Sequence, residues 1–128
     1  MNAIQKTKRI LVAEDDLVNQ KVAQKLLEKA GYHVQVAANG QKAIEYLHSC
    51  GQFDLVLMDV KMPVMDGVAA TGKIRESGLE FQHIPIIAMT AYAHANDRET
   101  FLAAGMDDHI AKPVDKQDLL NILTKYLD

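Results

Sequence analysis

The stretch FDLVLMDVKMPVMDG, residues 53–67, joins an apolar run to a turn through a single carboxylate. Four consecutive apolar residues, Leu55–Met58, lead directly into Asp59. Pro63 and the pair Asp66–Gly67 then indicate a turn. An uninterrupted apolar run is typical of a strand that is covered on both faces in a parallel sheet. The stretch therefore predicts that Asp59 lies at the C-terminal end of a central strand, beside an open turn.

The whole chain alternates strand-like and helix-like patterns. The predicted strands are Arg9–Ala13, Tyr32–Ala38, Phe53–Met58, Ile84–Met89 and Asp108–Ala111. The predicted helices are Leu17–Ala30, Asn39–Gly51, Val68–Gly78, Ala93–Gly105 and Lys116–Asp128. In the first helix, apolar residues recur at every fourth position, which indicates a helical period, and Gly31 is a natural stop. These apolar residues are Val18, Val22, Leu26 and Ala30.

The order of these patterns predicts the architecture. Strands that alternate with helices indicate an α/β fold with a parallel sheet covered by helices on both faces. The first, third and fourth strands are continuously apolar and suit the centre, whereas the alternating second strand and the short fifth strand suit the edges. A doubly wound, flavodoxin-like (βα)5 sheet of five parallel strands in the order 2-1-3-4-5 meets these conditions with right-handed crossovers. In such sheets, ligands bind beyond the C-terminal strand ends, here near strands 1 and 3.

Length and composition predict one globular domain. The chain has 128 residues, of which 48% are hydrophobic and 24% are charged, and its net charge is −3. This negative charge argues against a broad nucleic-acid-binding surface. The apolar runs are too short to span a membrane. The single cysteine cannot form an internal disulfide and fits a reducing compartment. We therefore expect a cytoplasmic monomer without direct contact to nucleic acid or membrane. The domain is expected over residues 8–128, after an extension or linker over residues 1–7.

Polar residues stand where the predicted strands end. They are Glu14, Asp15 and Asp16 after the first strand, Asp59 after the third, Thr90 after the fourth and Lys112 after the fifth. Crowded carboxylates repel one another, and a divalent cation removes this conflict. Oxygen ligands without histidine or cysteine favour Mg²⁺, or Mn²⁺, over zinc, and Mg²⁺ commonly pairs with a phosphate. An ammonium and a hydroxyl suit the remaining phosphate oxygens. The pattern indicates a site where Asp59 forms an aspartyl-phosphate.

Four motifs, in their order along the chain, resemble the receiver domains of two-component response regulators. They are ILVAEDD (residues 10–16), LVLMDVKMPVMDG (55–67), PIIAMTAYA (85–93) and IAKPV (110–114). Each motif is weak alone, but together they are specific, and the resemblance extends from Arg9 to Leu127. It implies that Asp59 accepts a phosphoryl group from a histidine kinase or a histidine phosphotransfer domain.

The resemblance also implies a set of metal ligands. Asp15 and Asp59 are expected to bind Mg²⁺, with Glu14 as the other member of the acidic pair. Glu14 stands where many stand-alone family members have Asp. The backbone carbonyl of Lys61 is expected to be the third protein ligand. Asp16 is expected to cap the first helix rather than to bind the metal.

The resemblance further implies a phosphoryl contact and a switch. Lys112 is expected to contact the phosphoryl group, and the Lys112–Pro113 peptide bond is expected to be cis. Thr90 is the expected switch hydroxyl, and the alternative is that it caps the following helix. Phosphorylation is expected to change the face formed by the fourth helix, the fifth strand and the fifth helix. His109 stands where the family commonly has an aromatic switch residue, which predicts a weaker switch.

Several alternatives for the whole protein stay open. The stretches EDDLVNQKVAQKLLEKAGY (14–32) and MTAYAHANDRETFLAAGMDDHIAKPV (89–114) look most like the receivers of hybrid sensor histidine kinases. A stand-alone regulator or a phosphorelay intermediate is the alternative. The resemblance implies a signalling module that promotes its own phosphorylation and dephosphorylation. A phosphohydrolase that uses an aspartyl-phosphate normally needs a second aspartate two residues after the nucleophile, and Lys61 stands there instead. A flavodoxin-like flavin or nucleotide binder needs a phosphate-binding loop after the first strand, where this chain has the acidic residues 14–16.

Overall fold

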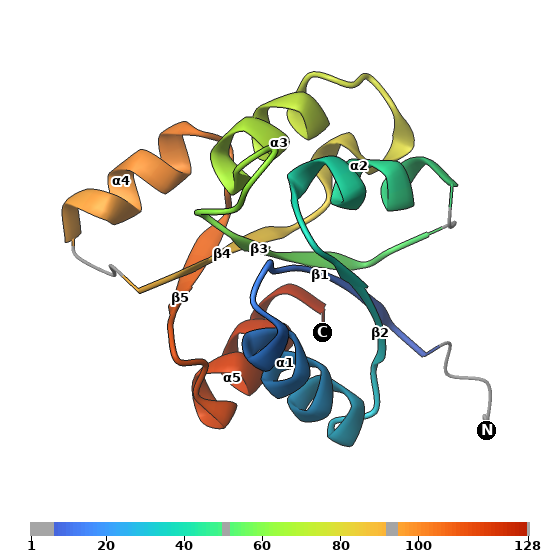
Figure 1. Cartoon of the computed structure of the whole chain (residues 1–128), viewed down its shortest axis with the longest axis vertical. Helices are drawn as coiled ribbons and strands as arrows, with labels where there is room; N and C mark the ends of the chain where they lie inside the picture. Colours follow the sequence, from blue (N-terminus) through green and yellow to red (C-terminus); the bar gives the residue numbers. More distant parts are fainter. Residues whose placement is uncertain (1–6, 50–51, 92–94, 128) are drawn as a thin grey trace.

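A computed structural model describes residues 7–49, 52–91 and 95–127 (Figure 1). Of the predicted N-terminal extension, only Thr7 lies within the described residues. The strands are β1 (Arg9–Ala13), β2 (His33–Ala37), β3 (Leu55–Asp59), β4 (Ile86–Thr90) and β5 (Asp108–Ala111). The helices are α1 (Leu17–Lys29), α2 (Gly40–Ser49), α3 (Gly67–Arg75), α4 (Ala95–Ala103) and α5 (Lys116–Leu127). The five predicted strands and five predicted helices are confirmed within the described residues, whereas residues 50–51, 93–94 and 128 of the predicted helices lie outside them. The short 3₁₀ helix η1 (Glu80–His83) was not predicted.

The sheet orders its strands β2-β1-β3-β4-β5, all parallel, as predicted. Its register places Val12 between Val36 and Leu57, and it pairs Met58 with Ala88. Helices α1 and α5 cover one face, and α2, α3 and α4 cover the other (Figure 1). The C-terminal ends of β1, β3, β4 and β5 consequently meet at one edge of the sheet.

Each face of the sheet has its own apolar core, because successive strand residues point to opposite faces. Leu11 and Val56 pack toward α2, α3 and α4. Val12 and Leu57 pack toward α1 and α5. All of β3 is buried, which explains the uninterrupted apolar run before Asp59. Within the described residues, none of these helices is long and apolar enough to cross a membrane.

Helix α1 packs on the sheet through one of its apolar faces. Ala23 and Leu27 are buried and Leu26 packs against the same core, whereas Val18 and Val22 are 67% and 41% exposed. Apolar residues occur on more than one face of α1, and a spacing of four residues defines a helical period without selecting the face that meets the sheet. One apolar face of α1 therefore lies in solvent, and Leu17 is 70% exposed there.

The two faces of α1 predict different outcomes for two truncations. Leu27 is fully buried, so Leu27→Ala should lower the free energy of unfolding by about 2–5 kcal/mol. Val18→Ala should change it by less than about 0.5 kcal/mol, because the Val18 side chain is largely in solvent. Urea unfolding followed by circular dichroism measures both effects. Equal losses in the two variants would contradict this orientation of α1.

Candidate functional site

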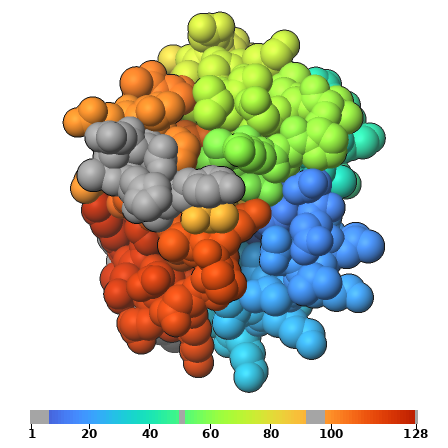
Figure 2. Space-filling model, turned by 60° about the vertical axis from the view of Figure 1, so that its left-hand side comes forward, coloured from blue at the N-terminus to red at the C-terminus, as the bar shows by residue number. Residues whose placement is uncertain are grey.

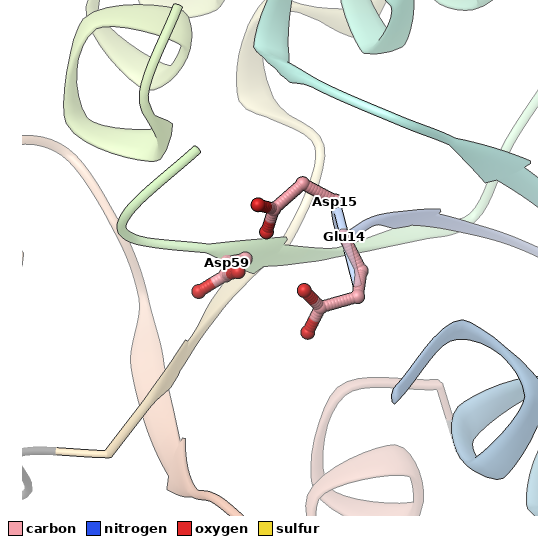
Figure 3. A group of neighbouring side chains, drawn as sticks. All are labelled: Glu14, Asp15 and Asp59. Atoms are coloured by element: carbon pink, nitrogen blue, oxygen red, sulfur yellow. The ribbon is translucent and has the colours of Figure 1, made fainter. Parts of the chain in front are cut away.

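Three carboxylates converge at the edge of the sheet where β1 and β3 end (Figure 3). Glu14 and Asp15 follow β1, and Asp59 is the last residue of β3. One oxygen atom of each carboxylate lies within 4.8 Å of an oxygen atom of each of the others. Glu14 and Asp59 are buried, and Asp15 is exposed. The fold thus brings the predicted acidic residues together around one space.

Hydrogen bonds fix the position of Glu14. Its N–H donates to the carbonyl of Ala37 at 2.9 Å, and its Oε2 accepts the N–H of Asp16 at 3.1 Å. Gln20 Nε2 donates to the carbonyl of Glu14 at 2.7 Å. Asp16 accepts the N–H of Asn19 at 2.9 Å and caps α1, as predicted. Glu14 is therefore oriented by both the sheet and the first turn of α1.

Lys112 connects two of the carboxylates. Its ammonium nitrogen lies 2.6 Å from Glu14 Oε1 and 3.0 Å from Asp59 Oδ2, and its side chain is 17% exposed. Its N–H donates to the carbonyl of Thr90 at 2.8 Å, and the Lys112–Pro113 bond is cis, as predicted. Burial alone lowers the pKa of a lysine, but the hydrogen bonds to Glu14 and Asp59 outweigh it and raise the pKa of Lys112 above its ordinary 10.5.

The charges of this group do not cancel. When the three carboxylates are ionised, the ammonium of Lys112 offsets one of their three negative charges. A divalent cation can offset the remaining charge of the carboxylates, and a ligand set of carboxylate oxygens without histidine or cysteine suits Mg²⁺. The three carboxylates that are present therefore fit a Mg²⁺ site.

A close approach between β3 and α3 shapes the turn after Asp59. The N–H of Gly67 donates to the carbonyl of Val60 at 2.9 Å, and a Cβ atom at Gly67 would collide with the carbonyl oxygen of Asp59. Asp66 accepts the N–H of Ala69 at 2.8 Å and caps α3. The glycine therefore allows the chain to fold back under the strand end and to leave Asp59 at the open edge of the sheet.

A hollow of 430 Å³ opens beside the carboxylates. Its lining includes Lys61, Thr90 and Phe101, in addition to the acidic residues and Lys112. Figure 2 shows this side of the molecule, where the blue surface of the start of α1, the green surface after β3 and the orange-red surface after β5 meet. The hollow has room for a phosphoryl group at Asp59.

Phe101 links the hollow to β5. Thr90 is buried at the end of β4, and the alternative that it caps α4 stays a prediction, because residues 92–94 lie outside the described residues. His109 lies in β5 and lines a separate hollow against α5. Phe101 lines the hollow at Asp59, and its ring centroid lies 6.4 Å from that of His109. The sequence pattern did not indicate Phe101, whose one signal was a large apolar residue in a polar helix.

The sequence matches the family model of the response regulator receiver domain over residues 10–124. It is 39% identical to the hybrid signal transduction histidine kinase I of Dictyostelium discoideum, over 94% of this chain and 7% of that protein. It is 40% identical to the two-component response regulator 24 of Arabidopsis thaliana, over 90% of this chain and 81% of that protein. The chain thus spans a small part of the hybrid kinase and most of the plant regulator.

A solved structure has the same fold. The receiver domain of sensor histidine kinase PA1611 from Pseudomonas aeruginosa PAO1 is 40% identical and superimposes with a TM-score of 0.85, over 94% of this chain and 98% of that chain. That structure has a magnesium ion coordinated in its active site cleft. The similarity agrees with the predicted flavodoxin-like sheet.

The bridging position of Lys112 predicts how stability depends on pH. Lys112→Met should lower the free energy of unfolding by about 2–4 kcal/mol at pH 8 without divalent cations, because it leaves Glu14 and Asp59 buried without their cation. The raised pKa means that the lysine's contribution is complete below pH 10.5 and is lost as the pH rises through the raised value. The difference between wild type and variant should therefore shrink only in strongly alkaline solution.

Lys125→Met is a matched control, because Lys125 pairs with Asp108 at 3.0 Å but is largely exposed. Urea unfolding between pH 8 and pH 11 should show a much smaller loss for this variant. A Lys112→Met protein as stable as wild type at pH 8 would count against the bridge.

Proposed function

The chain belongs to the response regulator receiver domain family, and we propose that its Asp59 accepts a phosphoryl group from a phosphohistidine. The observation that carries this proposal is the Lys112 ammonium, 3.0 Å from Asp59 Oδ2 within a cluster of three carboxylates. A nucleophilic carboxylate thereby has a cation beside it for the charge of the incoming group.

Transfer to Asp59 forms one bond and breaks another. A carboxylate oxygen of Asp59 attacks the phosphorus, the phosphorus–nitrogen bond of the phosphohistidine breaks, and its electron pair stays on the imidazole nitrogen. Lys112 offsets the negative charge of the phosphoryl oxygens as they enter the acidic cluster. Asp15, Asp59 and the backbone carbonyl of Lys61 are the proposed ligands of Mg²⁺ or Mn²⁺, with Glu14 beside them. The bound ion supplies positive charge next to the transferring group.

A phosphoryl group on Asp59 adds negative charge and acceptor oxygens to the hollow that the buried Thr90 also lines. Thr90 lines the same hollow as Phe101, and the ring of Phe101 lies beside that of His109 on β5. Movement of Thr90 toward the phosphoryl group would therefore reach the face formed by α4, β5 and α5. The response is a shift between existing states, and we expect it to be weaker with His109 than with a larger aromatic residue.

The exposed face of α1 supports docking of a protein donor. Leu17, Val18 and Val22 are in solvent, and Asp16 and Asn19 at the start of the same helix line the hollow at Asp59. Apolar residues that gather in solvent mark protein interaction sites. We therefore assign this face to the domain that carries the phosphohistidine, a histidine kinase or a histidine phosphotransfer domain.

The similarity to hybrid kinases favours a place within a hybrid sensor histidine kinase in the cytoplasm. The similarity to a plant response regulator over most of its length supports the alternative, a stand-alone regulator or phosphorelay intermediate. In both cases, the domain acts mainly as a monomeric signalling module that promotes its own phosphorylation.

Phosphorylation of Asp59 is tested with two donors, acetyl phosphate and a phosphorylated histidine phosphotransfer domain that transfers to the wild-type chain. With Mg²⁺, intact-mass analysis should show one added phosphoryl group from either donor. EDTA and Asp59→Asn should each abolish it, because the first removes the metal and the second removes the nucleophile. Equal labelling of Asp59→Asn would sink the assignment.

The same assay separates docking from chemistry. The double variant Leu17→Ser/Val18→Ser should slow transfer from the phosphotransfer domain by about tenfold or more, and leave acetyl phosphate labelling unchanged, because a small donor needs no docking face. Leu79→Ser removes another exposed leucine, away from the hollow at Asp59, and should change neither rate. Unchanged transfer from the protein donor in the double variant would rule out docking on α1.

A further inference from the structure

A second hollow, larger than the one at Asp59, lies at the opposite edge of the sheet, where β3 and β4 begin. Its volume is 610 Å³. It lies between the end of α2 and the yellow segment that contains η1 (upper right in Figure 1). Residues 47–48, 52–54 and 79–81 line this hollow, which we call the distal groove. No residue of the proposed phosphorylation site is among them.

The distal groove has an apolar and aromatic lining. Leu47 is buried, Phe53 and Phe81 are half-buried, and Leu79 is 45% exposed. The rings of His48 and Phe81 meet edge to face with their centroids 5.2 Å apart. This contact fixes Phe81 at the wall of the groove. The groove therefore offers rigid aromatic surface to whatever binds there.

Two carboxylates line the distal groove, and the guanidinium of Arg9 lies at its border, on the ring of Phe53. The carboxylates are those of Asp54 and Glu80, and among the described residues no lysine or arginine lines the groove itself. Asp54 accepts the N–H of Arg9 at 2.8 Å, whereas Glu80 is exposed at the start of η1. A ligand that is apolar at one end and cationic at the other matches this lining.

The chain's own Arg9 shows which cation suits these residues. Its guanidinium carbon lies 4.5 Å from the centroid of Phe53, and its Nη1 donates to the carbonyl of Gln52 at 3.2 Å. A planar guanidinium both stacks on an aromatic ring and donates to a neighbouring oxygen, which the compact ammonium of lysine does less well. The segment that borders the groove thus already binds one arginine side chain.

We propose that the distal groove binds an arginine-containing, amphipathic peptide segment of a protein partner. The guanidinium stacks on Phe81 and pairs with Glu80, and apolar neighbours of the arginine pack on Leu47 and Leu79. This surface is separate from the donor-docking face of α1, so a partner can occupy it while Asp59 is phosphorylated.

The test is an NMR titration of the whole ¹⁵N-labelled chain with the peptide acetyl-Leu-Arg-Leu-amide. Saturable shifts should concentrate at residues 47–48, 52–54 and 79–82. The analogue with citrulline, which has the shape of arginine without its charge, should bind more weakly. Glu80→Gln should weaken binding of the arginine peptide about two- to fivefold, as expected for one exposed ion pair.

Glu45→Gln is the matched control, because Glu45 is an exposed carboxylate on α2 that does not line the groove, and it should bind as wild type does. Labelling by acetyl phosphate should be equal in wild type and Glu80→Gln, so this result is independent of the proposed chemistry at Asp59. The proposal is overturned if the shifts scatter over the surface, if citrulline binds equally well, or if Glu80→Gln has no effect.

Discussion

The Lys112 ammonium lies between Glu14 and Asp59, and the rest of the site depends on this contact. It connects side chains at the C-terminal ends of β5, β1 and β3. The contact therefore depends on the observed strand order and register, because a slip of one residue turns a side chain to the other face. The bond from the Lys112 N–H to Thr90 ties the same residue to β4. Lys112 offsets only part of the negative charge of the three carboxylates, so the cluster can still bind a divalent cation.

The two edges of the sheet have different chemistry. The edge at Asp59 holds the acidic cluster, and the exposed apolar face of α1 begins beside it. The opposite edge holds the aromatic distal groove with Asp54 and Glu80. If both proposals hold, a phosphate donor and a second partner use separate surfaces of the domain. The fully buried β3, which runs between the two edges, separates them.

Much of the fold and site followed from local sequence patterns. Continuous apolar runs distinguished the central strands from the edges, and strand ends located Asp59, Thr90 and Lys112. The helical period of α1 did not select its packed face, because its apolar residues surround much of the helix and only contact with the sheet selects Leu27 over Val18. Phe101 was missed for a related reason: two adjacent large apolar residues, Phe101 and Leu102, in a polar helix define no period. The pairing of Lys112 with Glu14 depends on distant strands, which no local pattern contains.

The most direct test of the central claim is paramagnetic NMR with Mn²⁺ on the ¹⁵N-labelled chain. If Glu14, Asp15 and Asp59 form a single divalent-cation site beside Lys112, substoichiometric Mn²⁺ should broaden the amide signals of residues 14–16 and 59–61 first. Excess Mg²⁺ should restore these signals, because both ions prefer oxygen ligands. Broadening that begins at other carboxylates, such as Asp118 or Glu80, or that persists in excess Mg²⁺, would contradict the account.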